Sequence, residues 1–112
     1  MSYSVLIIDM FRYDPEEDYV IDGFQTFELA KEFARRWVRD SVEEYRQPGR
    51  SKEELRGMWY TFGEDAVVQG ETVYVGSHEL DYFVEHPATA EERDWQAVKR
   101  LAGITITPVS VR

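Results

Sequence analysis

Apolar and polar positions change their spacing several times along the chain, and each change predicts a new element. Residues 3–11 are apolar on both alternating faces, which is typical of a strand covered on both sides. Asp14, Pro15 and Glu16 favour a turn, because proline fixes φ at the second turn position. The chain then returns as a predicted strand over residues 19–21, which we expect Gly23 to end. A β-hairpin with an acidic turn is therefore predicted near the N-terminus.

Helical spacing begins after Thr26, a residue suited to an N-cap. From there one stripe is apolar or small and is expected to face the core: Ala30, Phe33, Ala34, Trp37, Val38, Ser41 and Tyr45. The opposite face is charged: Glu28, Lys31, Glu32, Arg35, Arg36, Arg39, Asp40 and Glu43. Opposite charges four residues apart stabilise such a helix. We interpret this face as solvated; binding of an anion by its arginines is the alternative.

A second helix is predicted after Gly49, because Ser51 and Glu54 have the spacing of a capping box. Its expected core-facing residues are Leu55, Met58, Trp59 and Phe62. Gly63 stands where a helix commonly ends. Two short segments of β composition, residues 66–69 and 72–75, flank Gly70 and Glu71 and predict a second hairpin.

The last third of the chain predicts two helices and a strand. Ser77 is a candidate cap for a short helix that Pro87 stops, with Leu80, Phe83 and Val84 inward. Thr89 and Glu92 form a second capping box, expected to open a helix that ends at Gly103, with Trp95, Val98, Leu101 and Ala102 inward. Residues 104–107 alternate as a strand should, and Pro108 shifts the alternation, so a bulge or sheet edge is expected there.

This order of elements, ββ-α-α-ββ-α-α-β, predicts the α+β class: a mainly antiparallel sheet of about five strands with helices packed on it. No linker or repeat interrupts residues 1–112, so a single domain is expected. Hydrophobic residues make up 43% of the chain and aromatic residues 14%, enough for a packed core despite the charge.

The chain carries a net charge of −9, from 22 acids and 13 bases. The excess lies in two stretches. Residues 1–25 hold six acids and only Arg12 as a base, and residues 59–88 hold six acids with no Lys or Arg. An anionic protein is repelled by nucleic acid phosphates and by anionic lipids, so direct binding to either is disfavoured. A basic protein partner is expected instead, and a homo-oligomer is a further option.

Other composition signals exclude several classes of protein. The chain has no cysteine, which excludes disulfides and thiolate metal sites. No basic segment followed by an apolar stretch marks a secretory signal, and the longest apolar run near the N-terminus is only residues 5–8. We expect a cytoplasmic location, in a bacterium or in the host if the gene belongs to a phage.

Candidate chemistry is sparse. His78 and His86 are eight residues apart on one predicted helix, roughly 12 Å by helical rise, too far to share one metal ion. Asp9 interrupts an apolar strand, and a buried carboxyl of this kind either transfers protons or is held by backbone N–H groups or by Arg12. No phosphate loop, nucleophile elbow or metal motif is present. We therefore expect no catalytic residue, no metal and no cofactor.

Four patterns carry a resemblance: Asp9-Met10-Phe11-Arg12-Tyr13, Gly23-Phe24-x-Thr26-x-Glu28, Pro48-Gly49-x-Ser51-x-Glu53-Glu54-Leu55 and Tyr60-Thr61-Phe62-Gly63-Glu64-Asp65. On these patterns, over residues 3–68, the chain resembles a family of small bacterial proteins that have no assigned activity. Members of that family usually carry an acid and a histidine where Met10 and Arg12 stand here. The resemblance implies no activity and no site.

Tyrosines beside carboxylates favour a protein interface, because the ring supplies contact area and the carboxylates select arginine and lysine. The expected partner-binding residues are Asp14, Glu16, Glu17, Asp18, Tyr19, Glu64, Asp65, Glu71, Tyr74, Glu79, Asp81, Tyr82 and Glu85. A sheet with a merely soluble outer face is the alternative reading of these residues.

The sequence thus predicts a non-enzymatic acidic protein that binds, and inhibits, a basic surface on a nucleic-acid-binding protein. Phage-encoded anti-CRISPR proteins are similar in size and charge. The alternatives are a small enzyme or ligand-binding domain that uses Asp9 with the helix of His78, and a homodimeric structural partner.

Overall fold

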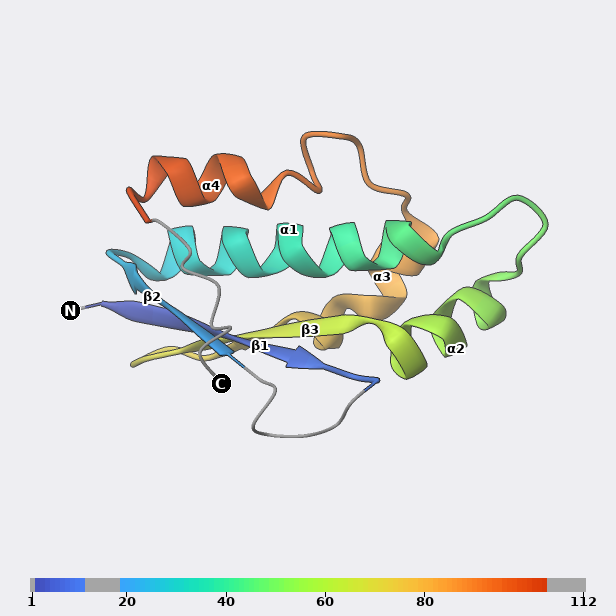
Figure 1. Ribbon diagram of the computed structural model, residues 1–112, viewed down its shortest axis with the longest axis horizontal. Coiled ribbons are helices and arrows are strands. Elements are labelled where there is room, and N and C mark those ends of the chain that lie inside the picture. The colour runs from blue at the N-terminus through green and yellow to red at the C-terminus, as the bar shows by residue number, and fades with distance from the viewer. Residues whose placement is uncertain (1, 12–18, 105–112) are drawn as a thin grey trace.

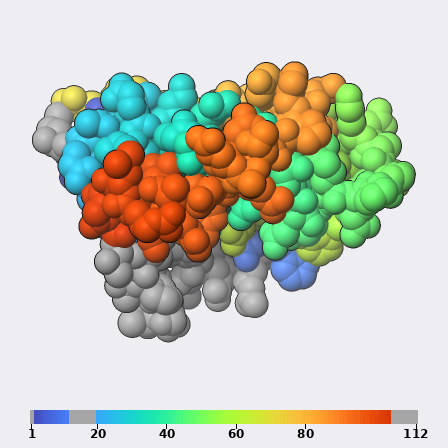
Figure 2. Space-filling model, turned by 90° about the horizontal axis from the view of Figure 1, so that it is seen from above, coloured from blue at the N-terminus to red at the C-terminus, as the bar shows by residue number. Residues whose placement is uncertain are grey.

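The computed structural model describes residues 2–11 and 19–104. Within them the elements follow the order β1 (Tyr3–Asp9), β2 (Tyr19–Phe24), α1 (Phe27–Tyr45), α2 (Lys52–Phe62), β3 (Glu64–Gln69), β4 (Tyr74–Val75), the 3₁₀ turn η2 (Gly76–Glu79), α3 (Leu80–Glu85) and α4 (Trp95–Leu101). Figure 1 shows α1 lying across one face of the sheet and α4 on the other side of α1. α2 and α3 lie at one end of the sheet. In the space-filling view, α4 and the segment before it cover part of α1 (Figure 2).

The sheet has the strand order β2-β1-β3-β4 and every neighbouring pair is antiparallel. Both predicted hairpins form, and the α+β class is confirmed. β1 is central, with Val5 opposite Ile21 on one side and Val68 on the other. The predicted fifth strand falls almost entirely on residues 105–112, outside the described residues.

The sequence predicted that Gly23 ends its strand. This prediction is wrong, because β2 continues to Phe24. The β1–β2 register shifts between Tyr3 and Val5, which marks a bulge opposite this point. Gly23 has φ of +99°, a conformation that glycine adopts without strain. Gly23 therefore accommodates a bulge without ending the strand.

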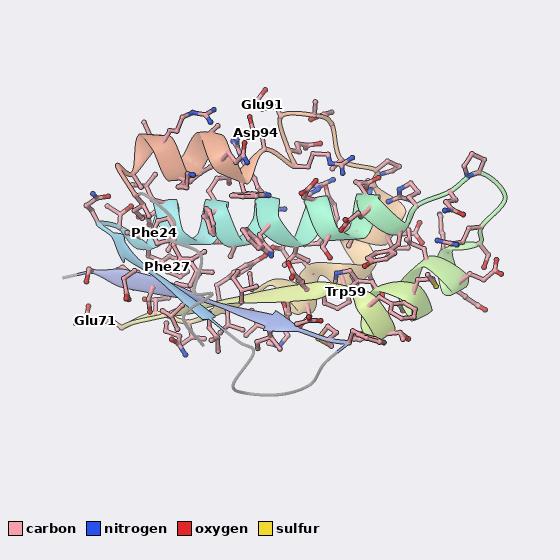
Figure 3. All side chains as sticks on the ribbon, in the orientation of Figure 1. Phe24, Phe27, Trp59, Glu71, Glu91 and Asp94 are labelled. Atoms are coloured by element: carbon pink, nitrogen blue, oxygen red, sulfur yellow. The ribbon has the colours of Figure 1, made fainter. Side chains whose placement is uncertain are left out.

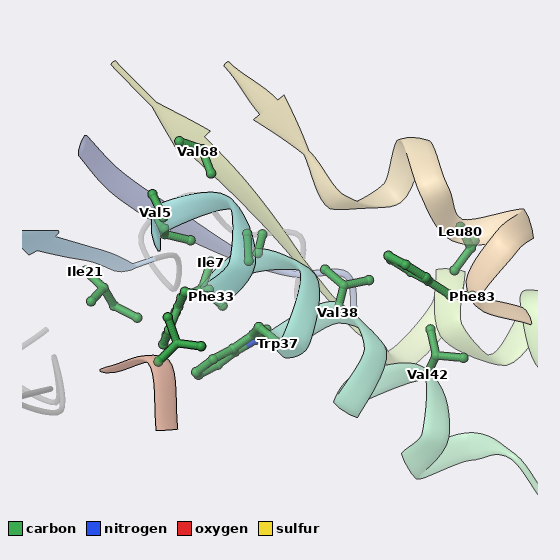
Figure 4. Packing of buried hydrophobic residues seen from close by; sticks show 14 of the residues in the cluster. Val5, Ile7, Ile21, Phe33, Trp37, Val38, Val42, Val68, Leu80 and Phe83 are labelled. Carbon is green, nitrogen blue, oxygen red and sulfur yellow. The ribbon is translucent and has the colours of Figure 1, made fainter. Parts of the chain in front are cut away.

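The core forms where α1 meets one face of the sheet (Figure 4). The predicted stripe of α1 is buried there: Ala30, Phe33, Ala34, Trp37, Val38 and Ser41, with Tyr45 half-buried. Val5 and Ile7 of β1 face this helix and are buried, whereas Leu6 and Ile8 on the other face are half-buried. The prediction that β1 is covered on both sides is therefore fulfilled on one side only, because the described helices pack on one face of the sheet.

The pattern predicted that the charged face of α1 is solvated, and the structure shows it only partly exposed. Arg39 is only 5% exposed, and its guanidinium donates to the carbonyl of His86 at 2.7 Å. Arg46, one residue past α1, donates to the carbonyls of Phe83 and Val84 at 3.0 and 3.1 Å. Cationic donors stabilise the carbonyl end of a helix. These arginines hold α3 and the following segment against α1, and this use accounts for them better than anion binding.

Local capping signals are mostly confirmed. The Thr26 hydroxyl accepts the Leu29 N–H at 3.1 Å, and Ser51 and Glu54 form the reciprocal capping box of α2. Gly63 caps α2, and a Cβ added there would come within 2.3 Å of the Trp59 ring. The close approach of that ring explains the glycine.

Two capping predictions are wrong: neither Ser77 nor Thr89 caps the helix that it was expected to begin. Ser77 does not cap α3; it lies in η2, and its N–H donates to the Asp65 carboxylate at 2.9 Å. Thr89 and Glu92 do bond each other reciprocally, but they close a turn, and α4 begins only at Trp95 with Asp94 as its N-cap.

Two residues predicted to face inward are exposed: Phe62 to 40% and Leu101 to 76%. Both stand in the last turn of their helices, beyond the neighbouring elements that bury the earlier turns.

Candidate functional site

The carboxylates of residues 79–85 are paired with bases of the two long helices. Glu79 lies 2.9 Å from Arg35, Asp81 lies 2.9 Å from Arg56, and Glu85 lies 2.5 Å from Lys52. Glu79 also accepts the Tyr74 hydroxyl, and this contact, with burial, raises the pKa of that tyrosine. The charge of this cluster is thus largely balanced within the protein.

Of the other predicted partner-binding residues, those that the structure describes do not share one face. Asp65 is buried and accepts two backbone N–H groups, those of Ala66 and Ser77. Glu71 is exposed at the end of the sheet opposite Trp59 (Figure 3). Tyr82 is half exposed and stacks on His86, with ring centroids 4.0 Å apart. Asp14, Glu16, Glu17 and Asp18 lie outside the described residues, and of Tyr19 only the backbone in β2 is described.

The fold does join the two acidic stretches at one point. Asp9 ends β1, Glu64 begins β3, and the register places them directly opposite each other. Both point to the α1 side of the sheet, because Ile7 and Ala66, two residues along each strand, are buried under α1. Like charges directly opposite in a sheet destabilise it, so the fold keeps an unfavourable pair here.

Beside Glu64 the protein has a cleft of about 210 Å³, which we call the acidic cleft. It is lined by Trp37, Asp40, Ser41, Glu44, Glu64 and Trp95. The four α1 residues follow the spacing i, i+3, i+4 and i+7, so they share one face of the helix. The indole rings of Trp37 and Trp95 lie 4.5 Å apart between centroids and form the apolar part of the wall.

Glu64 is held firmly in this cleft. Its side chain accepts the Trp37 indole N–H at 3.0 Å, and its backbone N–H donates to the Ser41 hydroxyl at 2.9 Å. Burial raises the pKa of Glu64, the charges of Asp9, Glu44 and Asp40 raise it further, and the Trp37 hydrogen bond opposes them.

Within residues 2–11 and 19–104, a single carboxylate of the acidic cleft has a cation beside it. Asp40 pairs with Arg93 at 2.7 Å and accepts the Trp95 indole N–H at 3.3 Å. Among the described residues, neither Glu44 nor Glu64 forms an ion pair with a lysine or arginine. The cleft therefore combines aromatic walls with uncompensated negative charge, which is a favourable environment for a cation.

Next to the acidic cleft is an aromatic patch, formed by Phe11, Tyr45 and Phe62. Ring centroids are 5.2 Å apart for Phe11 and Phe62, and 6.4 Å apart for Tyr45 and Phe62. Phe11 is 63% exposed. Burial and the charges of Glu44, Glu64 and Asp9 raise the pKa of Tyr45, which places the patch within electrostatic reach of the acidic cleft.

The sequence pattern indicated Glu64 as a binding residue, but it did not indicate the other residues that line the acidic cleft. Glu44 was not singled out, although it lies three residues after Ser41 on the core-facing stripe, and this spacing was the available signal. Trp37, Trp95 and Phe62 were assigned to the core, and Phe11 to a covered strand. Asp40 was placed on a solvated face. Nothing in the local pattern separates a cleft wall from a core position.

The alternative constellation is brought together only in part. Asp9 meets Glu64, but its side chain is also used locally, where it accepts the Phe11 N–H at 2.9 Å. His78 is exposed in η2 and does not line the acidic cleft, and His86 is the C-cap of α3 and not a member of the same helix. The described residues contain no group of three or more His, Asp or Glu placed to hold a metal ion. No described helix is long and apolar enough to cross a membrane.

Substitution of Glu64→Gln is expected to stabilise the protein at neutral pH by about 0.5–1 kcal/mol, because it removes the repulsion of Asp9 and keeps an acceptor for Trp37. The gain depends on pH. Because the folded-state pKa of Glu64 is raised, the wild type loses stability as pH rises from the ordinary glutamate pKa through the raised one, and the variant does not. Urea unfolding across this pH range measures the difference.

Glu71→Gln, at an exposed position at the other end of the sheet, is the matched control and should stay within about 0.5 kcal/mol of wild type. A difference between Glu64→Gln and wild type that stays constant from acid to neutral pH would contradict the assigned role of burial and repulsion.

Three comparisons were made with known proteins, and no protein-family model, no curated protein and no solved structure matches this chain.

Proposed function

We propose that this protein is a non-enzymatic acidic interaction protein that binds a basic surface of another protein through the acidic cleft. One observation carries the proposal: Glu44 and Glu64 lie at a cleft with two tryptophan rings and have no ion-pair partner among the described residues. Other described acids also have no ion-pair partner, Glu28 and Glu71 among them, but those two are not among the residues that line this cleft.

The size and chemistry of the cleft favour a single cationic side chain as its occupant. Small-molecule sites usually measure roughly 300–1,000 Å³, and this cleft, at about 210 Å³, is smaller. A guanidinium group is planar, stacks on indole rings and accepts bidentate pairing with carboxylates, so arginine suits these walls better than lysine. A partner arginine would form the ion pair that Glu64 does not form with any described residue of this chain.

Retention of an unfavourable arrangement also supports binding. Asp9 opposite Glu64, and Asp40 one turn from Glu44, are like-charge neighbours that reduce stability. Functional surfaces commonly reduce stability in this way, because the charges that repel each other in the free protein are compensated when a partner binds.

The finer proposal concerns the partner's own role. Basic protein surfaces with exposed arginines commonly bind nucleic acid, and an acidic protein that occupies such a surface competes with the phosphate backbone. We infer that the protein acts as an inhibitor of a nucleic-acid-binding protein, in the manner of phage-encoded anti-CRISPR proteins. The net charge of −9 supports this, since it speeds association with a basic partner.

Charge reversal tests the proposal. A partner captured from the native host should elute from the wild-type protein with rising salt, and its affinity should fall about a hundredfold for the Glu44→Lys variant, because attraction becomes repulsion in the cleft. Glu71→Lys is the matched control, with the same change of charge at the other end of the sheet, and should lose less than about threefold. Calorimetric titration of the purified pair gives both values, and equal losses would refute a role for the cleft.

A further inference from the structure

The proposed function leaves the aromatic patch of Phe11, Tyr45 and Phe62 unused. Phe11 and Phe62 are 63% and 40% exposed, and their rings contact each other in the open. Large apolar side chains that gather on a surface mark binding sites more often than isolated ones do. Tyr60 and Tyr82 are also about half exposed, but their ring partners are Trp59 and, for Tyr82, Phe83 and His86, so neither contacts a second exposed phenylalanine.

Strand pairing fixes the patch beside the acidic cleft. Asp9 and Glu64 are opposite each other, Phe11 follows Asp9 by two residues, and Phe62 precedes Glu64 by two. The Met10 N–H donates to the Gly63 carbonyl at 2.9 Å, so the two chains stay together past the end of the sheet. This arrangement brings the two phenylalanine rings into contact.

Tyr45 joins the two features from the α1 side. Its hydroxyl donates to the carbonyl of Phe62 at 3.0 Å, and its chain neighbour Glu44 lines the acidic cleft. Cleft and patch are thus adjacent parts of one surface, one anionic with indole walls and the other apolar.

Resting on the proposed function, we infer that the partner presents a short segment in which an arginine stands next to a large apolar side chain. The arginine enters the acidic cleft beside Glu64, and the apolar side chain packs on the aromatic patch. Charge complementarity identifies this occupant. A second copy would bring Asp9, Glu44 and Glu64 against their own counterparts, and a nucleic acid would bring phosphates against them, and both arrangements are repulsive.

Three synthetic peptides test the inference. The first alternates arginine and leucine, the second has serine for each leucine, and the third has citrulline for each arginine, which keeps the shape and removes the charge. With wild-type protein we expect the arginine–leucine peptide to bind about tenfold more tightly than the arginine–serine peptide, and the citrulline peptide not to bind. Fluorescence anisotropy of labelled peptides gives the affinities.

Protein variants separate the two parts of the surface. Phe62→Ser should weaken the arginine–leucine peptide about tenfold and leave the arginine–serine peptide unchanged. Glu64→Gln should weaken both peptides. Val73→Ser removes an apolar side chain elsewhere, 62% exposed against 63% for Phe11, and should change neither. Phe11→Ser repeats the test at the more exposed ring, and circular dichroism confirms that each variant is folded.

The outcomes distinguish a failure of the proposed function from a failure of the inference about the aromatic patch. If neither arginine peptide binds the wild-type protein, the proposed function fails. If both bind equally and Phe62→Ser and Phe11→Ser change nothing, the proposed function stands and this inference is overturned. A dimer in sedimentation that Phe62→Ser dissociates also overturns it, since the patch would then belong to a second copy.

Discussion

Substitution of Arg46 by methionine is expected to destabilise the protein by about 3 kcal/mol, because it leaves a buried carboxylate without its cation. The Arg46 guanidinium donates to both oxygens of Glu43, at 2.7 and 3.0 Å, and the Glu43 side chain is only 8% exposed. The same guanidinium donates to the carbonyls of Phe83 and Val84 at the end of α3. One substitution thus breaks an ion pair and the contact that holds α3.

Thermal unfolding provides the measurement. For a domain of this size the loss corresponds to a fall in Tm of roughly 10–20 °C. Arg100→Met, at an exposed position in the last turn of α4, is the matched control and should change stability by less than about 0.5 kcal/mol.

A double variant tests the cause. Adding Glu43→Gln to Arg46→Met removes the stranded charge, and the Gln side chain can still accept the Ala88 N–H that Glu43 accepts at 3.0 Å. The second change should therefore recover at least about 1 kcal/mol of what the first one loses. A single-variant loss below about 1 kcal/mol would show that the pair behaves as an ordinary surface ion pair.

Gly76→Ala is the second substitution with a large expected effect, a loss of about 1–3 kcal/mol by overpacking. A Cβ on Gly76 would come within 2.5 Å of the Val38 Cγ2 atom, within 3.2 Å of the Asp65 carboxylate and within 3.3 Å of the Ala66 carbonyl. Val38 is fully buried in α1, so the methyl group has no space to enter. At Gly76, η2 thus lies too close to Val38 of α1 to leave room for a side chain.

A double variant tests whether the Val38 side chain is what limits the space at Gly76. Val38→Ala alone should cost about 1–3 kcal/mol by leaving a cavity. The double variant, Val38→Ala with Gly76→Ala, should cost at least about 1 kcal/mol less than the two single losses together, because the new methyl group fills the vacated space.

Gly57→Ala is the matched control, since nothing lies within 4 Å of its Cβ position inside α2, and it should stabilise the protein by roughly 0.5–1 kcal/mol. Urea unfolding of the wild type, the two single variants, the double variant and the Gly57→Ala control gives the values. Strict additivity of the two single losses would mean that the Asp65 or Ala66 contact, and not Val38, limits the space.

Most of the fold could be predicted from the sequence, because most of its signals are local. The stripe of α1 follows helical spacing, Thr26 caps a helix three residues from its partner, and Ser51 with Glu54 does the same for α2. One capping prediction failed at a residue that is engaged by a contact distant in the sequence. Ser77 was expected to cap α3, and in the structure Asp65, twelve residues away, bonds the Ser77 N–H.

The candidate site could be predicted much less well. Glu64 was named from the sequence, but acids of residues 79–85 were named with equal weight, and those acids pair with Arg35, Lys52 and Arg56. Composition shows how many carboxylates exceed the bases. It does not show which of them the folded chain leaves without a base.

By itself, the amino-acid sequence determined the α+β class, the antiparallel hairpins, the helices and the apolar stripe of α1, because each depends on spacing over a few residues. Only the tertiary structure decided which charges remain uncompensated and which aromatic rings stay exposed. Those outcomes depend on contacts between distant positions, such as Arg35 with Glu79, 44 residues apart, and Trp37 with Glu64, 27 residues apart. The register of β1 against β3 then places Asp9 opposite Glu64, and no local pattern carries that information.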